Sequence, residues 1–260
     1  MILTKIIEQK EKEIKICKNK ISKEQLLAKI KGLKIHRRRN FFKSSISKPN
    51  KMHLIAEVKK ASPSAGIIRE DFNPVKIALS YEANGASAIS VLTDMKFFQG
   101  HISYLRDIRK KVSLPLLRKD FIIDEYQIYE SAEAGADAAL LISDLLSKEQ
   151  LKKFMDIGRQ LNMGFLVEVH SEEGVKKAID AGCEIIGINN RDLHTFKVDI
   201  KTTPRLLRII PEGKVIVSES GIREKKNILY LKSLGVNAVL AGETFMRSPD
   251  IGRKVRELIG

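Results

Sequence analysis

The chain has 260 residues, of which 43% are hydrophobic and 30% charged, with a formal net charge of +15. This composition excludes a disordered tail, a collagen and a small disulfide-stapled domain. Cys17 and Cys183 lie far apart, and the amino-terminal residues alternate Lys and Glu without an apolar core. We therefore expect no signal peptide, no membrane partner and a reducing, cytoplasmic location.

The positive charge is concentrated at the amino terminus. Residues 1–53 contain 16 Lys and Arg against 4 Asp and Glu, a net charge of +12, whereas residues 54–260 carry +3. Such a segment is a solvated helical face, a nucleic-acid-binding surface or an attractor of anionic ligands. Because it has no regularly interleaved aromatic residues, we favour the solvated face and expect no nucleic-acid partner.

The spacing of apolar and capping residues predicts two helices within residues 1–53. An apolar stripe runs along the first through Leu3, Ile7, Ile14, Cys17 and Ile21. Ser22 precedes Gln25 by three positions, which is the spacing of a capping box at the start of the second helix. This segment therefore reads as a helical extension of the domain that follows.

From residue 54, β-rich runs alternate with gaps long enough for helices. The runs are residues 54–60, 87–94, 114–122, 138–143, 164–170, 185–192, 214–220 and 238–244. Strands that alternate with helices predict parallel βαβ units, because parallel strands need long crossovers.

A helix-ending glycine recurs before every second predicted strand. Gly85, Gly135, Gly182 and Gly235 lie 50, 47 and 53 residues apart, so each interval spans two strand–helix units. Alternate strands share side-chain layers in a (β/α)8 barrel. We predict a single α/β domain over residues 1–260, with a helical extension at 1–53 and a (β/α)8 TIM barrel at 54–260. The alternative, an open doubly wound sheet, lacks a G-x-G-x-x-G after the first strand.

Catalytic residues of a barrel lie at the carboxyl ends of its strands, and residues two apart on a strand share a face. Glu57 and Lys59 share a face of the first run, which suits acid–base work, anion binding or an ordinary ion pair. Lys119 is flanked on its face by Leu117 and Phe121, so we expect its pKa to be lowered.

The fifth run offers a general base. Glu168 is its only carboxylate, and we expect an unpaired, buried Glu168 with a raised pKa. His170 ends the same run, and we interpret it as a solvated loop histidine. His36, His53, His101, His170 and His194 show no metal-ligand spacing, so no metal site is expected.

The last three runs supply polar groups and glycines. Asn189 and Arg191 share a face with Gly187, whereas alternation places Glu219 away from the lumen. Gly221 and Gly242 lie where a strand gives way to a helix, the usual phosphate site of this fold.

Residues 55–64, I-A-E-V-K-K-A-S-P-S, resemble the signature of the indole-3-glycerol phosphate synthase family of tryptophan biosynthesis. Further matches lie at residues 117–122, 166–169, 187–193, 219–222 and 242–247. The resemblance implies a carboxy-lyase that closes the indole ring of 1-(2-carboxyphenylamino)-1-deoxyribulose 5-phosphate, with loss of CO2 and water. It implies no cofactor, because an iminium formed by ring closure is the electron sink for decarboxylation.

Carried over by position, the resemblance also implies residue roles. Lys119 is the general acid, Glu168 is the general base of the dehydration, and Lys59 shares the acid role. Further catalytic positions are Glu57, Asn189 and Ser220. Implied substrate-binding positions are Ser62, Phe121, Arg191, Glu219, Gly221, Gly242 and Glu243.

The chain departs from the family pattern at Ala65 in the first loop and at Thr244 and Phe245 after the last strand, so we expect loop contacts and packing near the phosphate to differ from those of the family. The expected partner is a phosphorylated small molecule, and the expected state is a monomer or weak dimer. The alternatives are another phosphate-binding barrel enzyme of amino-acid biosynthesis and a nucleic-acid-binding protein that uses residues 1–53.

Overall fold

The computed structural model describes residues 2–33, 38–192 and 195–260, so His36, Leu193 and His194 lie outside the described residues. Within them, eight parallel strands close into a barrel in the order β1-β10-β9-β8-β7-β6-β5-β4. These strands are β1 (His53–Val58), β4 (Ala88–Leu92), β5 (Leu116–Lys119), β6 (Ala138–Ile142), β7 (Gly164–Val169), β8 (Ile185–Asn189), β9 (Val215–Glu219) and β10 (Ala238–Ala241). The predicted barrel is confirmed.

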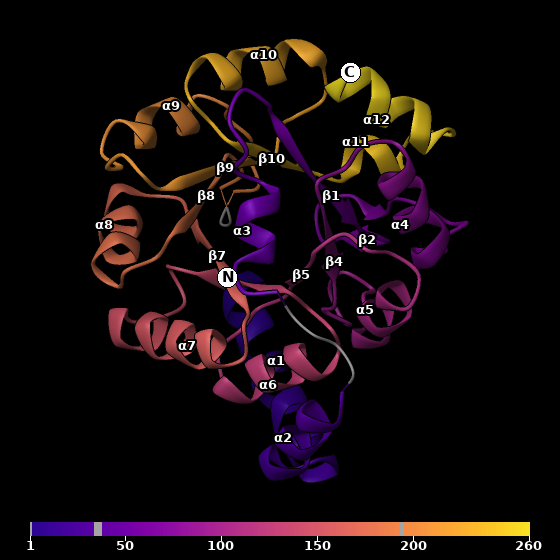
Figure 1. Cartoon of the computed structure of the whole chain (residues 1–260), viewed down its shortest axis with the longest axis vertical. Helices are drawn as coiled ribbons and strands as arrows, with labels where there is room; N and C mark the ends of the chain where they lie inside the picture. Colours follow the sequence, from indigo (N-terminus) through magenta and orange to yellow (C-terminus); the bar gives the residue numbers. More distant parts are fainter. Residues whose placement is uncertain (1, 34–37, 193–194) are drawn as a thin grey trace.

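Helices surround the strands as a ring (Figure 1). The barrel helices are α4 (Pro74–Ala83), α5 (Ile102–Arg109), α6 (Glu125–Glu133), α7 (Lys148–Gln160), α8 (Glu172–Asp180), α9 (Thr202–Leu207), α10 (Lys225–Ser233), α11 (Glu243–Met246) and α12 (Ile251–Ile259). The repeated glycines all have positive φ, between 83° and 96°, as expected for helix-ending positions. None of the described helices is long and apolar enough to cross a membrane.

Two apolar layers hold the barrel. Inward side chains such as Ile55, Leu117 and Leu166 fill the lumen, and a second layer packs between the strands and the helices. Phe42, in α3 (Phe41–Ser45), packs with the lumen residues just before the chain enters β1. The amino-terminal end of the barrel is thereby filled, which leaves the carboxyl end for a cavity.

The strands are shorter than the predicted runs, because the chain leaves the sheet near each carboxyl end. The first predicted run extends to residue 60, but β1 ends at Val58. An antiparallel pair of short strands, β2 (Ala61–Ser62) and β3 (Gly66–Ile67), follows. This hairpin was not predicted, since two-residue strands leave no alternation pattern to detect.

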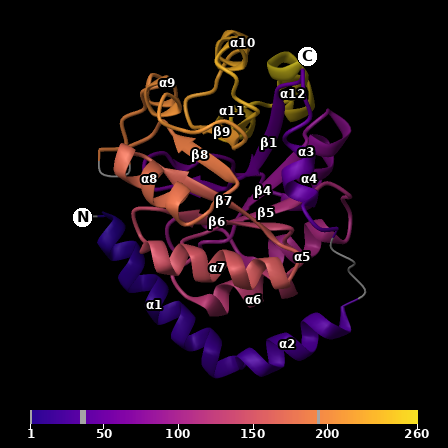
Figure 2. The ribbon, with the colours of Figure 1, turned by 60° about the vertical axis from the view of Figure 1, so that its left-hand side comes forward.

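The extension contains α1 (Ile2–Lys20) and α2 (Lys23–Gly32), which lie outside the barrel next to α6 and α7 (Figure 2). It also contains the short α3, a third helix that the sequence did not predict. The predicted capping box at Ser22 is confirmed. The buried residues of α1 are Ile6, Lys10 and Ile14. Ile14 of the predicted stripe is therefore buried, whereas Leu3, Ile7, Cys17 and Ile21 are half-buried, and the buried face includes a lysine that was not predicted.

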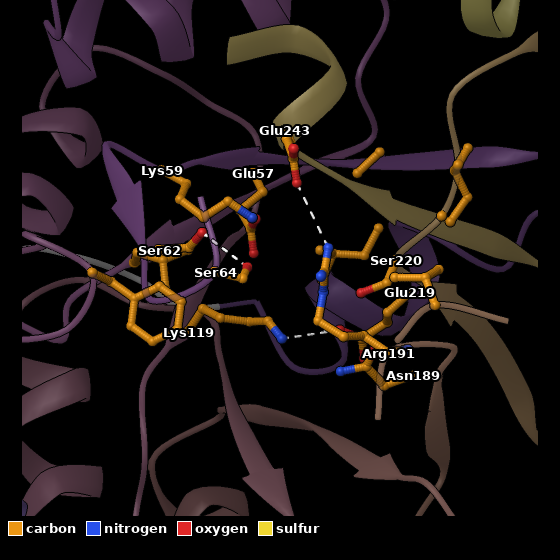
Figure 3. A pocket seen from close by; sticks show the side chains of 18 of the residues that line it. Glu57, Lys59, Ser62, Ser64, Lys119, Asn189, Arg191, Glu219, Ser220 and Glu243 are labelled. Atoms are coloured by element: carbon orange, nitrogen blue, oxygen red, sulfur yellow. Dashed lines mark hydrogen bonds and ion pairs between the residues drawn. The ribbon is translucent and has the colours of Figure 1, made fainter. Parts of the chain in front are cut away.

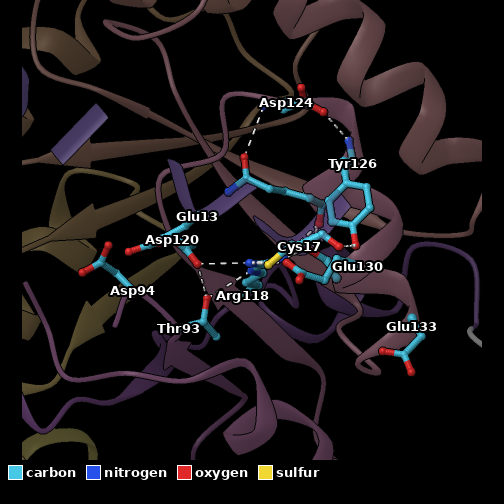
Figure 4. Close-up of polar contacts among 12 residues, drawn as sticks. Glu13, Cys17, Thr93, Asp94, Arg118, Asp120, Asp124, Tyr126, Glu130 and Glu133 are labelled. Carbon is cyan, nitrogen blue, oxygen red and sulfur yellow. Dashed lines mark hydrogen bonds and ion pairs between the residues drawn. The ribbon is translucent and has the colours of Figure 1, made fainter. Parts of the chain in front are cut away.

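Lys10 joins the extension to the barrel. Its Nζ lies 3.0 Å from Asp94 Oδ2 and 3.0 Å from Asp120 Oδ1, two carboxylates that follow β4 and β5. Asp120 also pairs with Arg118, whose guanidinium reaches Glu130 of α6 (Figure 4). A buried chain of charges thus runs from α1 across the end of β5 to α6.

We predict that Lys10→Met destabilises the fold by about 3–5 kcal/mol, because it leaves the buried carboxylate of Asp94 without its cation and leaves Asp120 with Arg118 alone. Lys18→Met is the matched control, since Lys18 is half-exposed and pairs with Asp124 at the surface, where an ion pair contributes less than about 1 kcal/mol. Urea unfolding measures both. Equal losses in the two variants would contradict the interpretation of Lys10.

Candidate active site

A cavity of about 440 Å³ opens at the carboxyl ends of the strands. All of the positions that the sequence singled out as catalytic or substrate-binding line it. Figure 3 shows how several of their side chains face one another, among them Glu57, Lys59, Lys119, Asn189 and Glu219. They come from β1, β5, β7, β8, β9 and the loops that follow these strands and β10. Convergence of residues so far apart in sequence follows from closure of the barrel, because every parallel strand ends at the same rim.

Lys119 lies at the centre of the site. Its Nζ donates to Glu168 Oε2 at 2.9 Å and to Glu219 Oε2 at 3.0 Å. Both carboxylates are almost completely buried. Burial lowers the pKa of the Lys119 ammonium, but the carboxylates of Glu168, Glu219 and Glu57 outweigh burial and hold that pKa above its ordinary value. The expected lowering was wrong, because the sequence shows apolar neighbours along the strand but not the carboxylates across the lumen.

Glu168 is paired, contrary to the sequence prediction. Besides Lys119, the side chain of Asn189 donates to Glu168 Oε1 at 3.1 Å, and His170 lies beside it. Burial raises the pKa of Glu168, but Lys119 and His170 outweigh burial and hold it below the usual value. The expectation of a raised pKa was therefore wrong, although the carboxylate is buried as expected.

Glu219 carries the raised pKa instead. Burial, opposed by Lys119 and reinforced by the negative charge of Glu168, raises the pKa of Glu219 to about 7. Among the described residues its Oε1 has no hydrogen-bond partner, which leaves the carboxylate less well compensated than Glu168. Lys119 thus lies between one carboxylate that keeps its charge and another that takes up a proton near neutrality.

The prediction that Glu219 faces away from the lumen was also wrong. Val215 and Val217 of β9 pack in the lumen, and Glu219 continues their face. Ser220 also lines the cavity, because the chain turns there with a φ of 66° and leaves strand geometry. Alternation on β9 therefore holds up to Glu219 and fails at the next residue.

The first strand and the last loop meet at Glu57. Lys59 Nζ lies 2.5 Å from Glu57 Oε2, and this pair faces into the cavity. A Cβ at Gly242 would lie 2.6 Å from the same Glu57 oxygen and 2.7 Å from Glu57 Cβ. Glycine is required at residue 242 because a side chain there would displace Glu57.

One rim of the cavity suits an anion. Gly221 has a φ of 80°, and Gly242 is followed directly by α11, whose first backbone amides have no partner within the helix. Ser62 and Arg191 face the cavity from β2 and from the loop after β8. Arg191 lies 3.6 Å from Glu243, so this carboxylate holds the arginine at the rim.

An apolar wall completes the cavity, and the sequence predicted only one of its residues. Phe121 faces Phe98 at 6.1 Å between ring centroids, and Leu140 and Ile142 lie in the same wall. Phe98 lies in the loop after β4, where no periodicity marks a residue as inward-facing. This wall suits an aromatic ring.

No group of three or more His, Cys, Asp or Glu that could hold a metal ion occurs among the described residues. The interpretation of His170 as a solvated loop residue was wrong, since its side chain is only 12% exposed.

Comparisons with known proteins agree with this geometry. The family model for indole-3-glycerol phosphate synthase matches residues 3–258. The chain is 52% identical over 257 residues to an indole-3-glycerol phosphate synthase of Acetivibrio thermocellus, covering 99% of this chain and 98% of the relative. It is 55% identical over 221 residues to that of Caldanaerobacter subterraneus subsp. tengcongensis, covering 85% of each.

Solved structures show the same fold at low sequence identity. A structure of 3-hexulose-6-phosphate synthase superposes with a TM-score of 0.65 at 12% identity, covering 80% of this chain and 98% of that chain. At this identity the likeness extends to the barrel alone. The family model and the close relatives go further: the chain belongs to the indole-3-glycerol phosphate synthase family.

Proposed function

We propose that Lys119 and Glu168 are the acid and the base with which this cavity closes the indole ring. The reaction of the family, which this chain catalyses, converts 1-(2-carboxyphenylamino)-1-deoxyribulose 5-phosphate into indole-3-glycerol phosphate, CO2 and water. The observation that carries the assignment is the position of Lys119, which lines the cavity and lies between the buried carboxylates of Glu168 and Glu219.

Ring closure needs a proton donor at the ketone. The ring carbon that bears the carboxylate attacks the ketone carbon, and the carbonyl oxygen takes a proton from Lys119. A charged ammonium is the form that can donate, and the surrounding carboxylates keep Lys119 in that form. The carbon–carbon bond leaves an iminium at the ring nitrogen next to the carboxylate.

Decarboxylation and dehydration follow. The bond to the carboxylate breaks, its electron pair neutralises the iminium, and CO2 leaves. Glu168 then removes a proton from the carbon beside the nitrogen while the hydroxyl formed from the ketone leaves as water, protonated by Lys59 or Lys119. Asn189 holds Glu168 through Oε1, and Glu57 holds Lys59, so each proton-transfer group has a fixed neighbour.

The anion-binding rim and the apolar wall of the cavity indicate how the substrate is placed. The phosphate binds to the backbone amides of Gly221, Gly242 and Glu243 and to the hydroxyl of Ser62. The aromatic ring packs on the wall of Phe121 and Phe98. Arg191 and Ser220 also line the cavity, where they supply donors for the ribulose hydroxyls and the carboxylate.

The proposal extends to a cytoplasmic monomer or weak dimer, folded as one domain over residues 1–260, with a phosphorylated small molecule and no nucleic acid as partner. Two free cysteines, Cys17 and Cys183, suit a reducing compartment. Several lysines of the extension, among them Lys10, Lys23 and Lys43, pair with carboxylates of the barrel, so part of the basic charge is used within the chain.

The first test is the reaction itself. We expect purified protein to release one CO2 for each indole product formed, because ring closure makes decarboxylation obligatory. Indole absorbance and released CO2 measure the two products. Failure to decarboxylate this substrate would overturn the function.

The second test removes the proposed acid. Lys119→Met is expected to lower kcat by about 10²–10⁴-fold, because a thioether cannot protonate the ketone. Lys153→Met is the control, since Lys153 is 62% exposed and pairs with Glu125 outside the cavity. Turnover of Lys119→Met close to that of wild type, in a folded protein, would refute the role of Lys119.

The third test concerns Gly242. Gly242→Ala is expected to lower kcat/KM by about 10–100-fold. The new methyl group displaces Glu57 and the backbone amides that follow residue 242. Gly32→Ala is the matched control, since nothing lies within 4 Å of a Cβ there. Equal kcat/KM in both variants would show that the close approach of Gly242 and Glu57 is unimportant.

A further inference from the structure

His170 lies between two carboxylates, one in β7 and one in the loop after β6. Its Nε2 is 3.4 Å from Glu168 Oε1, and its Nδ1 is 3.4 Å from Asp144 Oδ2 in the loop after β6. Neither ring nitrogen has a hydrogen bond of good geometry to any described residue. Both ring nitrogens are buried, whereas the Asp144 side chain is 36% exposed. The ring therefore connects the buried Glu168 to a carboxylate at the surface.

The geometry points to His170 as a positioning residue: Asp144 holds its ring as an imidazolium, which keeps the negative charge on Glu168 and leaves the shared proton of the site to Glu219. This inference rests on the proposed role of Glu168 as general base. His170 is not among the residues that line the cavity, so it acts on the reaction through Glu168.

The charges around the ring support this assignment. Burial lowers the pKa of His170, but Asp144, Glu168 and the more distant Glu219 outweigh burial and hold that pKa above its ordinary value. The imidazole in turn holds the pKa of the Asp144 carboxyl below its usual range. An imidazolium is the form that both carboxylates favour.

Two lysines share the same surroundings. Lys119 binds Glu168 and Glu219 alike, so it does not by itself decide which of them keeps the charge. Lys177 of α8 donates to the carbonyls of Ser143 and Leu146, and it adds a smaller positive contribution at Asp144. His170 touches Glu168 but not Glu219, so it breaks the near-symmetry of the two carboxylates.

The pH profile tests the inference through activity. The acid limb of kcat/KM reports the proton on the general base of the free enzyme. Loss of the cation in His170→Asn raises the pKa of Glu168, so we expect the acid limb to move to a higher pH by about one unit. At a pH on this limb, that shift lowers kcat/KM roughly tenfold. Activity on the alkaline plateau stays near that of wild type.

The variant Asp144→Asn shows whether Asp144 acts on Glu168 through His170 or as an independent charge. Without Asp144 the pKa of His170 falls, so the acid limb moves in the same direction but by less. The double variant is expected to match His170→Asn, because Asp144 acts only through the ring. Additive shifts in the double variant, or an unmoved limb in His170→Asn, would overturn the inference.

Controls separate this effect from general changes in charge or stability. His101→Asn keeps a good cap on α5, where His101 accepts from the Ser103 amide, and Asp156→Asn removes an exposed carboxylate of α7. Both are expected to keep the wild-type pH profile. A merely structural role of His170 would lower activity at every pH or lower the melting temperature without moving the limb.

Proton NMR tests the ring directly and does not depend on turnover. The His170 Cε1 proton, assigned by its absence in His170→Asn, is expected to titrate above 6.5 in wild type and at lower pH in Asp144→Asn. Titration at or below 6.5, or no response to Asp144→Asn, would overturn the inference. Glu168→Gln separately tests the general base, since activity retained in that variant would refute the role of Glu168 and leave the NMR result intact.

Discussion

The ammonium of Lys119 between two buried carboxylates is the interaction on which the site depends. Charged side chains that are shielded from water are stable only when they pair with one another. Glu168, Lys119 and Glu219 can pair because β5, β7 and β9 end at the same rim of the barrel. The closed barrel and the apolar layer below supply the low-dielectric surroundings in which these pairs are strong. Catalysis by proton transfer follows from that arrangement.

The neighbours of this cluster give its members different properties. Glu168 has a second donor in Asn189 and a cation in His170, whereas Glu219 has one oxygen without a described partner. Two buried carboxylates that pair with the same lysine therefore have pKa values shifted in opposite directions. Such a split is what acid–base catalysis near neutral pH requires.

The amino-terminal extension supplies a buried cation close to this cluster. Lys10 reaches from α1 to Asp94 and Asp120, and Asp120 follows Lys119 directly in the chain. Part of what looks like surplus positive charge in the sequence is thus buried and paired. The basic segment is a structural element that covers one side of the barrel.

The sequence by itself determined the eight strands, the glycines that end alternate helices and the polar positions at the strand ends that line the cavity, because these depend on local periodicity and on motifs at strand ends. Only the tertiary structure decided the charges and orientations: the pairing of Glu168, the inward direction of Glu219 and the burial of His170. The physical reason is that a pKa depends on groups within a few ångströms in space. Lys119, Glu168 and Glu219 become neighbours only when the barrel closes.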